Sequence, residues 1–208
     1  MVLLIRSFRV QISDRMRRLL VPLIALFIGF GALVAAAVLT LRPDVQETRP
    51  SAVGGPFTLV SHEGKEVTDR AFLGAPFLVF FGFTHCPDVC PTKLFEISEA
   101  LRATGERGRA LRALFITVDP ERDTPEVLKS YLGSFDPRII GLTGNPAAVD
   151  AAVRVYRGFA RKAASKDGGY TMEHTALVYL MDKTGRFVGA FNLDRPPVAA
   201  AQELLQRL

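Results

Sequence analysis

The run FLVFFGF at residues 77–83 is the feature that most constrains the fold, and the chain's only two cysteines follow it in CPDVC, residues 86–90. An unbroken apolar run of this length is typical of a strand that is covered on both faces. It therefore predicts a central strand with helices on either side of its sheet. Cys86 and Cys90 then come just after the carboxyl end of that strand, at the entry to a helix.

The segments that follow alternate between strand-like and helix-like patterns. Leu94, Ile97 and Leu101 recur at i, i+3 and i+7 and predict a helix of about four turns. The order of elements predicts the α/β fold class, with a thioredoxin-like mixed sheet flanked by helices, parallel in its first part and mixed at its end. The other predicted elements are strands at 57–60, 114–118 and 139–142, a helix at 146–156, a hairpin at 176–181 and 186–191, and a closing helix at 196–208.

The charge of the chain lies mostly at its N-terminus. Residues 1–18 carry five arginines and one aspartate, a charge of +4 that leaves only +1 of the formal +5 for residues 19–208. The folded part therefore lacks the basic excess of a nucleic-acid-binding domain, and we expect no nucleic acid partner. Residues 19–41 are an uncharged, mostly apolar run of 23 residues, which as a helix of about 34 Å would span a bilayer.

This pattern predicts one N-terminal transmembrane helix at 19–41, with the basic tail of residues 1–18 in the cytoplasm and the remainder exported. A cleavable signal peptide, with a site at the alanines 35–37, is the alternative. Residues 42–56 predict a tether, and 57–208 a single folded domain. The expected location is a bacterial inner membrane with the domain in the periplasm. The same pattern of a basic tail and an apolar span would also fit a mitochondrial inner membrane, with the domain facing the intermembrane space.

The two cysteines are open to several interpretations: inert buried thiols, a stabilising disulfide, a redox couple or a metal site. A disulfide that encloses three residues would constrain the unfolded chain little. The N-terminus of a helix stabilises a thiolate over a thiol, which promotes both redox exchange and metal binding. The position of Cys86 and Cys90 therefore favours these two chemistries.

A histidine late in the sequence helps to distinguish redox exchange from metal binding. Redox thioredoxins use C-x-x-C and place a cis-proline before the hairpin strand, whereas this chain has C-x-x-x-C and carries His174 at the corresponding place, in YTMEHTALVYL. The fold would bring His174 over Cys86 and Cys90. Two thiolates and one imidazole suit Cu(I), while a structural zinc site needs a fourth protein ligand, which we do not find in the sequence. We therefore expect copper at Cys86, Cys90 and His174.

Three segments resemble the Sco/SenC copper-chaperone proteins of cytochrome oxidase assembly: FGFTHCPDVCPT (81–92), ITVDPERDTPEVLKSYLGSFDPRIIGLTG (116–144) and HTALVYLMDKTGRF (174–187). The resemblance covers essentially the whole domain after the tether. It implies a membrane-anchored metallochaperone rather than an enzyme, which binds a copper ion through Cys86, Cys90 and His174. The implied partners are cytochrome c oxidase subunit II or another copper oxidase, and a thiol-disulfide reductant. An exported thiol-disulfide oxidoreductase that uses the same cysteines is the alternative function.

Four further features have more ordinary explanations. His85 could be an alternative ligand, but its side chain is expected to diverge from that of Cys86. Asp119 either tunes the site or caps the loop after its strand. DTPE at 123–126 predicts a helix start with Asp123 as N-cap and Glu126 closing a capping box. Residues 157–170 are expected to be a solvated loop, with a mobile lid or docking patch as the alternative.

Overall fold

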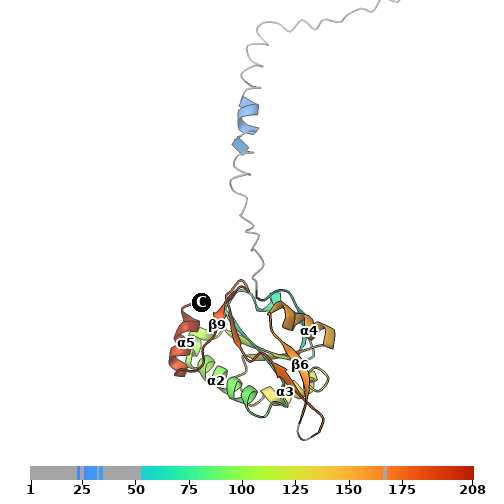
Figure 1. Cartoon of the computed structure of the whole chain (residues 1–208). Coiled ribbons are helices and arrows are strands. Elements are labelled where there is room, and N and C mark those ends of the chain that lie inside the picture. The colour runs from blue at the N-terminus through green and yellow to red at the C-terminus, as the bar shows by residue number, and fades with distance from the viewer. Residues whose placement is uncertain (1–22, 24–25, 32, 35–52, 166–167) are drawn as a thin grey trace, which may run out of the picture. The chain divides into compact units, whose positions relative to one another are not determined.

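The structure is a computed structural model that describes residues 23, 26–31, 33–34, 53–165 and 168–208. The chain divides into two units, Met1–Thr48 and Arg49–Leu208 (Figure 1). Each unit is described by itself.

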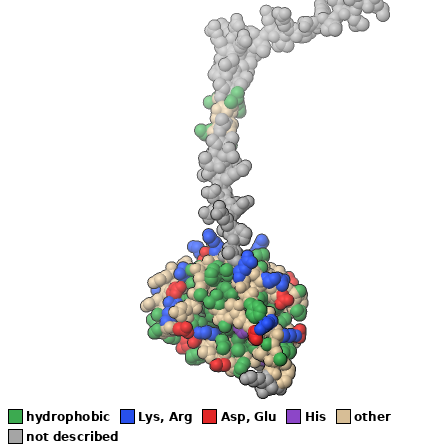
Figure 2. Space-filling view, viewed as in Figure 1, with side chains coloured by type: hydrophobic (Ala, Val, Ile, Leu, Met, Phe, Trp, Pro, Cys, Tyr) green, Lys and Arg blue, Asp and Glu red, His purple; other side chains and the backbone are tan. Residues whose placement is uncertain are grey.

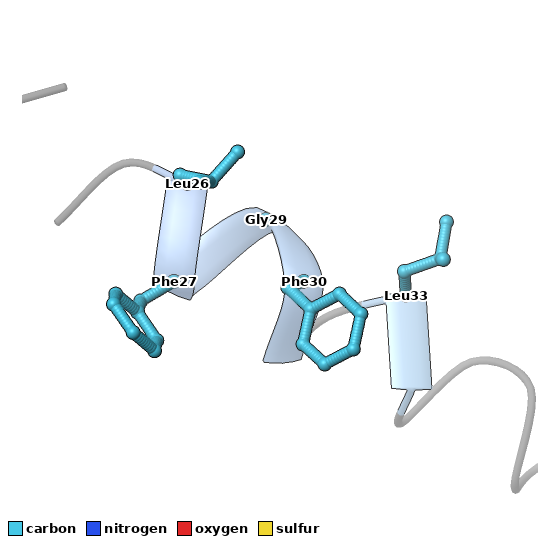
Figure 3. Close-up of a pocket in the computed structure, with 5 residues that line it drawn as sticks. All are labelled: Leu26, Phe27, Gly29, Phe30 and Leu33. Carbon is cyan, nitrogen blue, oxygen red and sulfur yellow. The ribbon is translucent and has the colours of Figure 1, made fainter. Parts of the chain in front are cut away.

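The described residues of the N-terminal unit form a short apolar helical segment. Residues 26–31 and 33–34 are helical, and the large side chains along this segment point outward around it (Figure 3). They are at least 65% exposed: Leu26, Phe27, Phe30 and Leu33. Within the described part of the chain, no helix is long and apolar enough to cross a membrane. The predicted tail at 1–18, most of the predicted span at 19–41 and most of the tether lie outside the described residues.

The C-terminal unit is built on a sheet of seven strands in the order β2-β1-β5-β4-β3-β8-β9. β3, β4 and β5 run parallel to one another, whereas β1 joins β5, β2 joins β1, β8 joins β3 and β9 joins β8 antiparallel. The predicted thioredoxin-like mixed sheet is therefore confirmed. The strands of this sheet are β1 (Thr58–Ser61), β2 (Glu66–Thr68), β3 (Phe77–Gly82), β4 (Arg112–Thr117), β5 (Ile139–Thr143), β8 (Val178–Met181) and β9 (Phe187–Ala190).

Helices cover both faces of this sheet. In Figure 1, α5, α2 and α3 follow one another along one side and α4 lies on the other, and α2 packs directly against α5. The helices are η1 (Asp69–Phe72), α2 (Val89–Ala103), η2 (Gly105–Gly108), α3 (Pro125–Leu132), α4 (Pro146–Val155) and α5 (Pro197–Leu205). This is the flanked arrangement that the continuous apolar run predicted.

β3 lies at the centre of the core because both of its faces are covered. All six of its residues are buried. A Cβ at Gly82 would meet Cys90 of α2, whereas Phe81 points to the opposite face and packs edge-on against Tyr156, which follows α4, with ring centres 5.5 Å apart. The predicted apolar positions of α2, Leu94, Ile97 and Leu101, are all fully buried.

The prediction of a solvated loop at 157–170 is wrong. Residues 160–164 and 170–174 pair as an antiparallel hairpin of two strands, β6 (Ala160–Ala164) and β7 (Tyr170–His174), which form a sheet of their own. Most side chains of β6 are exposed. The hairpin therefore lacks the alternating apolar pattern from which a strand is predicted.

The predicted N-cap of α3 is shifted by one residue. Thr124, and not Asp123, caps the helix, because its side chain accepts a hydrogen bond from the Val127 amide and Pro125 is the first helical residue. Asp123 is fully buried beneath it. Its carboxylate is therefore available for contacts with the neighbouring strands.

Acidic and basic side chains lie among one another on the face of the C-terminal unit that Figure 2 shows. This mixed surface agrees with a net charge of only +1 for residues 19–208. A single-sign field of the kind that attracts nucleic acid is not visible on that face.

Candidate metal centre

The three predicted ligands come from three places in the fold. Cys86 lies in the turn between β3 and α2, Cys90 is the second residue of α2, and His174 is the last residue of β7. The turn follows the carboxyl end of β3, which is the edge where ligands bind in sheets of this class. The hairpin that contains β7 supplies the third residue from a distant part of the sequence.

The sulfur of Cys86 accepts a hydrogen bond at the start of α2. The Cys90 amide donates to Cys86 Sγ at 3.4 Å, while the side chain of Asp88, the N-cap residue, makes no capping hydrogen bond. The thiol group of Cys86 thus takes the place of the oxygen that usually satisfies a first-turn amide. Both cysteines are free thiols.

Cys90 is buried beside a glycine that leaves room for its sulfur. A Cβ at Gly82 would lie 2.9 Å from Cys90 Sγ and 2.5 Å from Cε2 of Phe115, closer than real Cβ atoms come. Burial raises the pKa of the Cys90 thiol, although a backbone hydrogen bond with Phe83 acts in the opposite direction. The thiol is therefore protonated at neutral pH, and binding a metal would release that proton.

The imidazole of His174 directs one nitrogen at this sulfur. Nε2 lies 3.9 Å from Cys90 Sγ, and Nδ1 lies 3.0 Å from the carbonyl oxygen of Thr175. A carbonyl can only accept, so the hydrogen bond assigns the proton to Nδ1 and leaves the lone pair on Nε2. Burial lowers the pKa of His174, against a smaller opposing effect of the Thr175 hydrogen bond. The ring is thus neutral and has the orientation of a metal ligand.

The contacts join Cys86 to Cys90 and Cys90 to His174. Among the residues that the structure describes, no group of three or more His, Cys, Asp or Glu side chains is already arranged to hold a metal ion. The structure thus brings together the two thiols at the helix start, and one thiol with the imidazole. The complete three-residue ligand set remains a prediction.

His85 and Asp119 have other partners. The ring of His85 is 54% exposed, and its Nδ1 faces Thr84 Oγ1 at 3.1 Å and Asp123 Oδ1 at 4.0 Å. Asp119 is buried, accepts from the Tyr170 hydroxyl at 2.9 Å, and pairs with Arg122. The His85 ring thus faces Thr84 and Asp123, in line with the expectation that it turns away from Cys86. Asp119 contacts Tyr170 and Arg122.

Asp123 holds the turn before Cys86, a role that the sequence did not indicate. Its carboxylate accepts from the amide and hydroxyl of Thr84 at 3.0 Å and 2.6 Å, and from the Thr117 hydroxyl at 2.6 Å. The end of β4 is thereby tied to the turn after β3. The only signal was the density of charged residues in DPERD, directly after a buried strand, and no spacing rule assigns their partners.

Comparison with known proteins gives consistent matches. The family model SCO1/SenC matches residues 45–208. Protein SenC of Rhodobacter capsulatus is 40% identical over 152 residues, which cover 73% of this chain and 69% of that protein. Protein SCO1 homolog 1, mitochondrial, of Arabidopsis thaliana is 40% identical over 139 residues, 66% of this chain. The chain spans only 42% of the length of that mitochondrial relative.

The structure of Bradyrhizobium japonicum ScoI with copper bound is similar over the C-terminal unit. It has a TM-score of 0.73 and 57% sequence identity, and the match covers 76% of this chain and 100% of that one. Together, the family model and these relatives show that the chain belongs to the SCO1/SenC family.

Proposed function

We propose that this chain is a copper metallochaperone that binds a copper ion through Cys86, Cys90 and His174. The observation that carries this proposal is the approach of His174 Nε2 to within 3.9 Å of Cys90 Sγ, with Nδ1 held by the Thr175 carbonyl. An imidazole in this tautomer presents its lone pair to the position that a thiolate-bound metal would occupy.

The donor set favours copper over other metals. Two sulfurs and one nitrogen suit Cu(I), whereas a closed zinc site would need a fourth protein ligand. The copper-bound structure of Bradyrhizobium japonicum ScoI, at 57% identity, gives independent support. A soft ion held by three protein ligands can pass to another set of thiolates. The partly buried Cys86 leaves one side of the site accessible for that exchange.

The proposed recipient is cytochrome c oxidase subunit II or another copper oxidase, because the Sco/SenC proteins that the sequence resembles act in oxidase assembly. Residues 1–18 would lie in the cytoplasm, 19–41 would cross a bacterial inner membrane once, and 42–56 would tether the copper-binding domain at 57–208 in the periplasm. The arginine-rich start and the uncharged run that follows it support this topology. A thiol-disulfide reductant would keep both cysteines reduced.

Copper stoichiometry tests the proposal. The reduced full-length chain in detergent should bind one equivalent of Cu(I) in competition with a chelator, and none once Cys86 and Cys90 are joined as a disulfide, because the disulfide removes both thiolates. The double variant Cys86→Ser, Cys90→Ser should likewise bind none. If the double variant retained a full equivalent, the proposed site would be wrong.

A second candidate function is thiol-disulfide exchange by the same cysteines. It is favoured by the position of Cys86 Sγ at the start of α2, where it accepts a hydrogen bond from the Cys90 amide, because reactive cysteines commonly lie at helix starts. The burial of Cys90 beside a more accessible Cys86 fits this division of roles. Dithiol exchange does not require His174, so the His174→Ala variant distinguishes the two functions.

A further inference from the structure

Arg122, in the loop between β4 and α3, is enclosed by groups from three parts of the fold. The central carbon of its guanidinium lies 4.0 Å from the centre of the Tyr170 ring and 5.9 Å from that of Phe83. Nε pairs with the carboxylate of Asp119, and Nη1 donates to the carbonyl oxygen of Tyr170 at 3.2 Å. The side chain is only 26% exposed. Arg122 therefore joins its own loop to the end of β3 and to the hairpin β6–β7.

The two aromatic neighbours of Arg122 are also linked to His174. The ring of Phe83 meets the imidazole edge-on, with ring centres 5.7 Å apart and an interplanar angle of 90°. Tyr170 and His174 are the first and last residues of β7. Arg122 thus contacts both the ring against which the imidazole packs and the strand that carries it.

Side-chain contacts determine where this hairpin lies. β6 and β7 pair with each other in a separate two-stranded sheet. The Tyr170 hydroxyl donates to Asp119 at 2.9 Å, while Lys162 of β6 lies over the Tyr170 ring at 4.5 Å and pairs with Glu121 at 2.6 Å. Arg122 and Tyr170, stacked on each other, both contact the buried carboxylate of Asp119.

Not every interaction of Arg122 stabilises the fold. Its Nη2 is buried without a hydrogen-bond partner among the described residues. A buried donor that is left unsatisfied is destabilising. Replacing Arg122 removes this cost, but it also removes the stacking and leaves the buried carboxylate of Asp119 without its ion-pair partner. Global stability should therefore fall together with the placement of His174.

We propose that Arg122 is a positioning residue, which by stacking between Phe83 and Tyr170 holds the hairpin so that His174 Nε2 faces Cys90. The effect of Arg122 on copper affinity, which is one test of this inference, rests on the proposed copper site. The structural part, the placement of β7 by Arg122, stands independently of any metal.

The test compares full-length wild type with Arg122→Gln and Arg122→Lys. Both variants should bind Cu(I) about 10- to 100-fold more weakly, as is common when groups that orient a ligand are lost. Arg122→Lys should not rescue, because an ammonium keeps the charge but lacks the planar surface that stacks. In the metal-free state, the amides of residues 170–174 should exchange hydrogen faster in both variants, by a larger factor than the amides of β3.

Arg161 offers a matched control on the same hairpin. It also pairs with an acid, Glu173, and lies over an aromatic ring, that of Phe159 at 5.8 Å, but its side chain is 64% exposed. Exposed pairs of this kind contribute little, so Arg161→Gln should keep a copper affinity within about twofold of wild type. The comparison separates the loss of a particular stack from the loss of an arginine.

The outcomes distinguish this inference from the proposed function. If wild type binds copper and His174→Ala weakens binding, but both Arg122 variants match wild type in affinity and in hydrogen exchange at 170–174, the positioning role is refuted and the copper site stands. If wild type binds no copper, the proposed function fails, and hydrogen exchange alone decides on Arg122. Unchanged exchange at 170–174 in a folded Arg122→Gln chain would contradict the inference in either case.

Discussion

His174 Nε2 lies 3.9 Å from Cys90 Sγ, although 84 residues separate the two in the chain. Cys90 is fixed by its burial at the start of α2, whereas His174 ends a hairpin that lies outside the main sheet. One member of the pair thus belongs to the buried core and the other to a separate two-stranded sheet. This difference should allow the metal affinity and the thiol chemistry of the site to be changed separately.

The first prediction is that His174→Ala separates copper binding from thiol redox chemistry. The variant should lose at least about tenfold in Cu(I) affinity, because it lacks the proposed nitrogen ligand, the group that faces Cys90. Cys86 and Cys90 should still cycle between dithiol and disulfide, which a thiol-trapping assay in glutathione buffers measures. An unchanged affinity would remove His174 from the ligand set and favour the oxidoreductase function.

The second prediction concerns the glycine beside Cys90. Gly82→Ala would place a Cβ 2.5 Å from the Phe115 ring and 2.9 Å from Cys90 Sγ. The crowding should lower the free energy of unfolding by about 1–3 kcal/mol and weaken copper binding. Gly189→Ala on β9, where a Cβ has open space, is the control and should leave copper binding unchanged. Equal effects of the two substitutions, measured by urea unfolding and copper titration, would contradict this packing argument.

The third prediction uses a buried ion pair away from the site. Arg138 Nε and Nη2 donate to the two carboxylate oxygens of Asp136, each at 2.8 Å. Burial alone would raise the pKa of Asp136, but the hydrogen bonds and charge of Arg138 outweigh it and hold the pKa below its ordinary value of 3.8. A lowered pKa in the folded state contributes stability above pH 3.8, and that stability is lost as the pH falls toward the folded-state pKa.

Asp136→Asn should therefore lower the free energy of unfolding by roughly 1–3 kcal/mol at pH 7, the usual worth of hydrogen bonds to charged groups. The difference from wild type should narrow as the pH falls below about 4, because wild type then loses the same charge. Chemical unfolding measured from pH 2.5 to pH 7 checks this. If the difference in the free energy of unfolding between wild type and Asp136→Asn stayed constant over the whole pH range, the charge of Asp136 would make no contribution to stability.

The fourth prediction concerns a buried hydroxyl near the thiols. Tyr131 packs between Phe115 and Phe135, with ring centres 6.0 Å and 5.6 Å away, and its hydroxyl is buried without a partner among the described residues. Tyr131→Phe removes only this hydroxyl, so it should leave stability unchanged or raise it by up to about 1 kcal/mol. Tyr170→Phe, which loses a hydrogen bond to Asp119, should instead destabilise. If calorimetry showed that Tyr131→Phe lowers the melting temperature while Tyr170→Phe leaves it unchanged or raises it, the argument from these hydroxyl contacts would be contradicted.

Much of the fold can be predicted from the sequence because burial leaves a periodic pattern. The run 77–83 predicted β3, and Leu94, Ile97 and Leu101 predicted the buried face of α2. The hairpin β6–β7 could not be predicted, because the residues of its strands are exposed or half-buried and leave no such pattern. Its position depends on contacts of Tyr170 with residues about 50 positions earlier, which no local signal records.

The candidate site was predictable in its residue types but not in its supporting contacts. Spacing and fold together indicated Cys86, Cys90 and His174. The proton position on the imidazole depends on the Thr175 carbonyl, and the orientation of the turn before Cys86 depends on Asp123. The first contact joins neighbouring residues and depends on the local backbone conformation, whereas the second is a product of tertiary geometry. The shift of the α3 cap from Asp123 to Thr124 has the same cause, since burial in tertiary contacts withdrew Asp123 from capping.

X-ray absorption at the copper edge tests the central claim most directly. The Cu(I)-loaded, reduced full-length chain should show two sulfur scatterers and one nitrogen scatterer, the nitrogen having the multiple-scattering pattern of an imidazole ring. His174→Ala should keep the two sulfurs and lose the imidazole pattern. A wild-type spectrum with no imidazole, or an imidazole pattern that persists in His174→Ala, would contradict the account that Cys86, Cys90 and His174 form the copper site.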